Sequence, residues 1–199
     1  MKRFPLTSTN SYSSKYRPGE KLYATLELNQ VAFPKTGMVV SQTPLGSAFT
    51  KQAPCENGMW VVADKAAGAI NPPAAVTDKP LGIVYTAEKE YDNFHYGLKT
   101  FGRKVEGDYP RVGIFGLGDT VTTNCLQYDE NTYATFADLE AALKTAAAGG
   151  AAMYVIPTAG DGVPTLTANK GSATTYGKVV KYYTVPNGEK GVKYQIVSL

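Results

Sequence analysis

Residues 176–199 read YGKVVKYYTVPNGEKGVKYQIVSL, and this stretch contains the clearest structural signal in the chain. Two runs rich in Val and Tyr lie on either side of Asn187-Gly188. Asn-Gly is a dipeptide that strongly favours the tight turn of a β-hairpin, because both residues tolerate positive φ angles. We therefore predict a C-terminal β-hairpin over residues 176–199, with its last residues tied into a sheet.

Upstream of this hairpin, short apolar runs alternate with turn residues through the middle of the chain. Gly, Pro, Asn or Asp follow the runs closely, as expected for strands joined by turns. The runs are Met59–Ala63, Leu81–Thr86, Arg111–Phe115, Thr120–Thr123 and Met153–Pro157. Together with the hairpin they predict a mainly β protein, a compact antiparallel β-barrel or sandwich-like domain over residues 21–199.

The first part of this domain is also predicted to be strand. Residues 21–28 alternate between apolar and polar side chains with the period that a half-buried strand requires. Residues 31–33 and 37–40 are expected to continue the sheet across a turn that begins at Pro34. By contrast, residues 65–80 and 158–173 are rich in turn-forming residues, so we predict that both are connections.

One segment has the period of a helix. Thr135 is a suitable N-cap with Asp138 three residues later, which is close to a capping box. Apolar side chains at Phe136, Leu139 and Leu143 share one face before Gly149 ends the pattern. Because this apolar stripe is narrow, we predict a short surface helix near residues 136–148 that packs on a sheet.

Residues 1–20 lack apolar periodicity and are rich in Ser, Tyr, Lys and Arg, which predicts an extended N-terminal arm. Its tyrosines and cations suit docking on a neighbouring subunit, and plain terminal disorder is the alternative. The candidate interface residues are Arg3, Tyr12, Tyr16 and Arg17. Deleting a docking arm should weaken binding to the partner but leave the thermal unfolding midpoint of the domain nearly unchanged.

Composition limits the classes of function. Of the 199 residues, 43% are hydrophobic and 19% are charged, which is the balance of a globular protein. The net charge of +3 is too small and too dispersed to predict a nucleic-acid groove. No apolar run has the length of a membrane span, and none follows the first cations as in a signal peptide. We therefore expect no membrane partner and synthesis in a reducing cytoplasm.

Reactive side chains are sparse. His95 is the only histidine and lies between two aromatic residues, as a packed or surface residue would. Glu88 and Glu106 belong to segments in which acids are mixed with cations, a pattern typical of solvated surface, although a glycosidase pair is the enzymatic alternative. Cys55 and Cys125 lack zinc-site spacing and are expected to be buried or reduced thiols, with a single disulfide as the alternative. We therefore assign no catalytic residue, cofactor or metal site and expect no enzymatic activity.

The order of turns and strands carries a family resemblance. The segments are Asn57–Asp64, Asp78–Val84, Tyr109–Phe115 and Gly118–Asn124, which contain a Gly before a strand, a later Pro-Leu-Gly strand and a later Gly-Asp strand. This succession resembles the head decoration, or cement, proteins of tailed bacteriophages. The resemblance covers roughly residues 57–128 and, more loosely, the C-terminal half.

The resemblance implies a non-enzymatic virion protein with a β-barrel-like fold. Such a protein is made in the host cytoplasm, sits on the capsid exterior, and binds the major capsid protein and other copies of itself, often as a trimer. A tail or head-fibre component is one alternative. A carbohydrate-binding module is another, and it would need Trp60 exposed for stacking on sugars, whereas the apolar run around Trp60 predicts burial.

Overall fold

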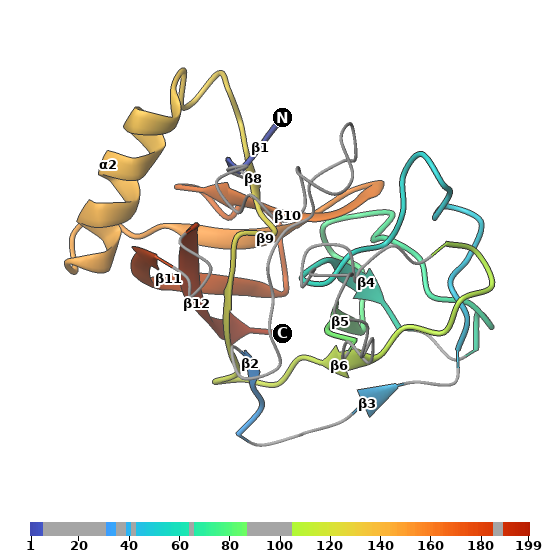
Figure 1. Cartoon of the computed structure of the whole chain (residues 1–199). Coiled ribbons are helices and arrows are strands. Elements are labelled where there is room, and N and C mark those ends of the chain that lie inside the picture. Colours follow the sequence, from blue (N-terminus) through green and yellow to red (C-terminus); the bar gives the residue numbers. More distant parts are fainter. Residues whose placement is uncertain (6–30, 35–38, 41–42, 64–65, 87–104, 185–188) are drawn as a thin grey trace, which may run out of the picture.

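Two β-sheets and one helix make up the part of the chain that the computed structural model describes (Figure 1). The described residues are 1–5, 31–34, 39–40, 43–63, 66–86, 105–184 and 189–199. The mainly β class is therefore confirmed for this part. Closure into a barrel, or a sandwich, stays a prediction.

The larger sheet, sheet A, combines strands from both ends of the sequence. In spatial order its eight strands are β1 (Lys2–Arg3), β8 (Gln127–Tyr128), β10 (Asp161–Thr167), β9 (Tyr154–Thr158), β11 (Tyr176–Thr184), β12 (Lys190–Ser198), β7 (Thr120–Thr123) and β2 (Val31–Ala32). Neighbours are antiparallel except β8 and β10, which are parallel. The predicted C-terminal hairpin is confirmed as β11 and β12, which lie near the middle of this sheet.

The smaller sheet, sheet B, is built from the short apolar runs in the middle of the chain. Its order is β3 (Val39–Val40), β6 (Val112–Ile114), β5 (Leu81–Val84) and β4 (Trp60–Val62), all antiparallel. The prediction that residues 31–33 and 37–40 continue one sheet is wrong, because β2 pairs with β7 in sheet A and β3 pairs with β6 in sheet B. Periodicity identifies a strand but does not select its partner.

The predicted helix is confirmed as α2 (Phe136–Ala147). The Thr135 backbone N–H donates to Asp138 Oδ2 at 2.9 Å and the Asp138 N–H donates to Thr135 Oγ1 at 3.3 Å, so the capping box is complete. Leu139 and Leu143 are buried, and the helix packs against β11. Figure 1 shows α2 at the side of sheet A away from sheet B.

Side chains of both sheets meet in one hydrophobic core. Trp60 of sheet B is fully buried there, with its ring centroid 4.8 Å from that of Phe115. Its indole Nε1–H donates to the hydroxyl of Tyr194 in sheet A at 2.9 Å. The predicted burial of Trp60 is confirmed, and this hydrogen bond joins the two sheets inside the core.

The connection predicted over residues 158–173 is wrong, because β10 occupies Asp161–Thr167. Its Gly, Pro and Thr residues make this strand look like a loop in the sequence. In the structure Val163 and Leu166 are buried, and the strand pairs with both β8 and β9. A register shift between Asp161 and Thr165 interrupts the regular alternation. The connection predicted over residues 65–80 contains none of the named strands or helices in its described part.

The first five residues lie in the fold instead of an arm. β1 pairs with β8, the Phe4 N–H donates to the Leu126 carbonyl at 2.8 Å, and the Phe4 side chain is only 1% exposed. The Phe4 and Phe136 rings meet edge to face with centroids 5.0 Å apart, so this segment also supports α2. Residues 6–20 of the predicted arm and the strand predicted over 21–28 lie outside the described residues.

Candidate functional site

Arg3 is the one predicted interface residue that the structure describes, since Tyr12, Tyr16 and Arg17 lie outside the described residues. Arg3 Nη1 lies 2.6 Å from Glu56 Oε1, and Glu56 is 2% exposed. The Arg3 side chain is therefore engaged within the fold, where it ties β1 to the loop that precedes β4. Its role in contacting a partner stays a prediction.

A cavity of about 460 Å³ lies beside Arg3, with Phe49, Met59, Gln127 and Asp161 among its lining residues. Two of its polar side chains bind the Val163 backbone: Asp161 Oδ1 accepts from the Val163 N–H at 2.9 Å, and the Gln127 amide donates to the Val163 carbonyl at 2.7 Å. Arg3 Nε and Nη2 are buried and have no hydrogen-bond partner among the described residues. The Gln127 bond holds β8 against β10, whereas the Asp161 bond lies within β10. This arrangement has the character of a structural polar network.

The groups considered for catalysis do not converge in the described part of the chain. Glu106 is exposed in a turn in which the Val105 N–H donates to Asp108 Oδ2 at 2.9 Å. Glu88 and His95 lie outside the described residues. Within the described ranges, no group of three or more His, Cys, Asp or Glu side chains is placed to hold a metal ion.

Both cysteines are free and buried, as predicted. Burial raises the pKa of the Cys55 thiol, and the nearby Glu56 carboxylate raises it further. Burial also raises the pKa of Cys125 well above its ordinary value. Since the thiolate is the nucleophile and these thiols stay protonated, neither cysteine has the environment of a reactive residue.

The outer face of sheet A is a described surface with a distinct chemistry. Val179, Tyr194 and Val121 are cross-strand neighbours on β11, β12 and β7, and all three are buried in the core. Residues one position away point to the opposite face. There Lys178 lies opposite Gln195. Lys181 also reaches this face, opposite Lys193, because the register shifts between Val179 and Lys181.

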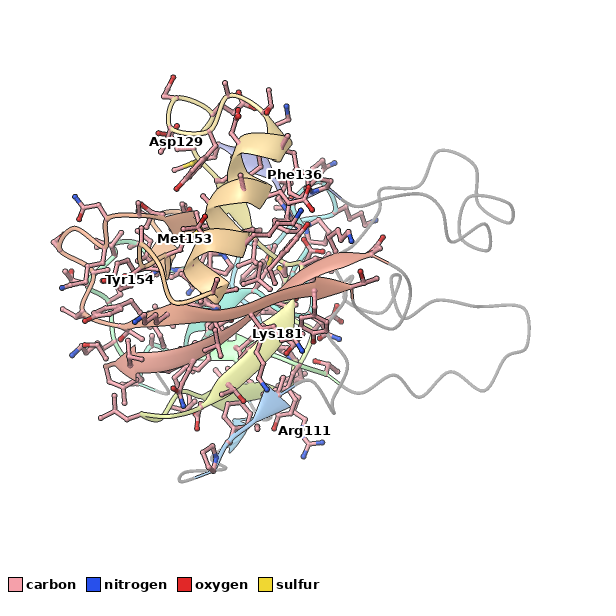
Figure 2. The ribbon with its side chains drawn as sticks, turned by 90° about the vertical axis from the view of Figure 1, so that its left-hand side faces the viewer. Arg111, Asp129, Phe136, Met153, Tyr154 and Lys181 are labelled. Atoms are coloured by element: carbon pink, nitrogen blue, oxygen red, sulfur yellow. The ribbon has the colours of Figure 1, made fainter. Side chains whose placement is uncertain are left out.

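Two tyrosines extend this outer face, one on β9 and one at the start of β11. Tyr154 lies opposite Lys178, and its ring meets that of Tyr176 edge to face with centroids 5.6 Å apart. Figure 2 shows Tyr154 and Lys181 apart along these strands. We call the surface formed by these residues the Lys–Tyr face: Tyr154, Tyr176, Lys178, Lys181, Lys193 and Gln195.

The charge of this face has one sign. Strands β7, β9, β11 and β12 contain four lysines and neither Asp nor Glu. Among the described residues, no carboxylate forms an ion pair with Lys178, Lys181 or Lys193. The small net charge of the whole chain conceals this concentration, because acids at other sequence positions offset the lysines in the sum. Only the register reveals it, by placing lysines of two strands side by side.

Exposed apolar side chains lie at one end of the same sheet. Leu117 is 48% exposed, Val197 42% and Leu199 42%. The turn that carries Leu117 is attached to β12, because the Gly118 N–H donates to the Ile196 carbonyl at 2.9 Å. We call these three residues the apolar end of the Lys–Tyr face. Apolar anchors beside polar groups are the usual composition of a protein–protein interface.

The comparisons with known proteins add no family. No family model, curated protein or solved structure matches this chain significantly. Among the described residues, no helix has both the length and the apolar character needed to cross a membrane.

Proposed function

We propose that this chain is a non-enzymatic structural protein that binds other protein on the exterior of a tailed-phage capsid, as a decoration or cement protein. The observation that carries the proposal is the Lys–Tyr face, a regular surface of lysines and tyrosines with exposed apolar side chains at one end. Tyrosine supplies rigid contact area with a polar tip, which suits a broad interface.

The fold supports a bracing role. Sheet A and sheet B share a core, which favours a sandwich-like arrangement, and buried contacts such as Trp60 to Tyr194 connect them. The two described sheets, connected in this way, lose little conformational entropy on binding, because their own groups are already ordered. On a capsid, many copies acting together would give avidity from modest individual contacts.

The sugar-binding alternative loses its main candidate. Trp60 is fully buried and its N–H is already bonded to Tyr194, so it offers no stacking surface to a carbohydrate. The tail or head-fibre alternative uses the same kind of surface and differs in location within the particle. Binding to capsids and to tails, measured separately, distinguishes this alternative from the proposed one.

The test is binding of the purified chain to emptied capsids of the phage whose genome carries this gene. We expect saturable co-sedimentation, with a fixed number of copies per capsid, and density on the outer capsid surface in electron micrographs. Purified tails of the same phage serve as the control. Binding to tails alone, or to neither, would overturn the proposal.

A further inference from the structure

We propose that the Lys–Tyr face docks on an acidic protein surface, with Lys178, Lys181 and Lys193 facing carboxylates and the apolar end inserting beside them. This inference rests on the proposed function in taking a protein as the partner. It adds which face makes the contact and what chemistry the partner presents.

Two like charges face each other on the Lys–Tyr face. Lys181 and Lys193 lie directly opposite each other on β11 and β12. Like charges in directly opposed positions destabilise a sheet. Lys181 Nζ lies 5.7 Å from the Tyr183 ring centroid, a contact that leaves its charge in place, and no described carboxylate forms an ion pair with Lys181 or Lys193. A partner that supplies negative charge would therefore relieve the repulsion.

The charge of the Lys–Tyr face is complementary to that of an acidic partner. A surface carrying lysines on three neighbouring positions of a two-stranded ribbon attracts carboxylates and repels basic partners. β11 also has a register shift between Val179 and Lys181, and Val180 at this irregularity is 47% exposed. An apolar side chain is thus available between the lysines.

Nucleic acid is another anionic partner that lysines and aromatic side chains can bind, but the tyrosine geometry of this face favours a protein. Single-stranded nucleic acid uses exposed aromatic faces on which bases stack. Here Tyr154 and Tyr176 meet at an interplanar angle of 87°, and Lys170 lies 4.8 Å from the Tyr176 ring centroid. One face of Tyr176 is therefore occupied. Apolar side chains such as Leu117 and Val197 also match a protein surface better than a phosphate backbone.

The test uses Lys193→Glu, which changes binding and stability in opposite directions. The variant places a carboxylate opposite Lys181, so the fold gains a cross-strand ion pair and the unfolding midpoint should rise by about 1–4 °C. Binding to capsids should weaken about five- to thirtyfold, because one attractive contact becomes repulsive. A merely structural lysine would move both quantities in the same direction.

Lys51→Glu is the matched control, since it makes the same change in net charge at an exposed loop position. Beads coated with poly-L-glutamate provide a second probe that does not depend on capsids. We expect wild type and Lys51→Glu to be retained at similar salt concentrations and Lys193→Glu to elute earlier. Equal effects of the two substitutions would show that only net charge matters and would overturn the inference.

Two further measurements distinguish the remaining outcomes. Leu117→Ser should weaken capsid binding but leave retention on poly-L-glutamate unchanged, because that polymer offers no apolar socket. Tighter, Lys193-dependent binding to single-stranded DNA than to poly-L-glutamate would assign the face to nucleic acid and overturn the inference. If capsids bind no variant while the poly-L-glutamate result holds, the acidic preference stands and the proposed capsid function fails.

Discussion

Tyr194→Phe should destabilise the protein, because it removes the only hydroxyl that the buried Trp60 N–H contacts among the described residues. The bond is 2.9 Å long, and both side chains are fully buried. Phenylalanine fills nearly the same volume, so the main loss is the bond itself and the unsatisfied donor left behind. A buried unsatisfied donor costs about 1–3 kcal/mol. For a chain of this size the midpoint should fall by about 2–12 °C.

The assay is thermal and urea unfolding, with Tyr182→Phe as the matched control. Tyr182 lies on the neighbouring strand, but its hydroxyl donates to Glu140 at 3.1 Å on the partly exposed side of α2, where water can replace the partner. This control should lose clearly less stability. In a Trp60→Phe background, Tyr194→Phe should also cost less than in the wild type, because the orphaned donor is gone. Equal losses for the two tyrosines would refute the reasoning.

The same hydroxyl predicts a pH dependence. Burial raises the pKa of Tyr194 above its ordinary value, so the neutral form is favoured in the folded state. The unfolded chain ionises this tyrosine near pH 10, and the stability it contributes is therefore present below about pH 10 and lost as the pH rises further. Tyr194→Phe should accordingly show a smaller loss of stability than wild type between neutral pH and pH 11.

Three further predictions concern other parts of the fold. Phe4→Ala should lower the free energy of unfolding by about 3–5 kcal/mol in urea titrations, because Phe4 is a buried core residue. An unchanged midpoint would show that this segment belongs to the predicted arm and not to the core. Thr135→Ala should cost about 1 kcal/mol through loss of the N-cap of α2, while Thr135→Ser keeps the capping oxygen and should restore most of it, as followed by circular dichroism. Cys55 and Cys125 should react with a thiol reagent only at the rate at which the protein opens, and fast labelling in native buffer would contradict their burial.

The elements that could be predicted from the sequence are those with local signals. Asn187-Gly188 predicts the hairpin, Thr135 and Asp138 predict the start of the helix, and the run containing Trp60 predicts a buried strand. Each of these depends on neighbours within a few residues. The structure confirms all three elements for the residues it describes.

What could not be predicted depends on contacts between distant residues. β1 is only Lys2–Arg3, and its place in sheet A follows from pairing with β8 far along the chain. β10 lacks a regular alternation because of its register shift. The Lys–Tyr face has the same origin, since Lys181 and Lys193 are ordinary surface lysines until the register sets them opposite each other.

The position of β12 within sheet A has a consequence for biosynthesis. This strand lies between β7 and β11, so the edge of β7, which is synthesised much earlier, is covered only after β12 has been made. A nascent chain that lacks residues 190–198 would therefore present unpaired strand edges, which are templates for aggregation. We expect the soluble yield to fall when residues 190–198 are deleted.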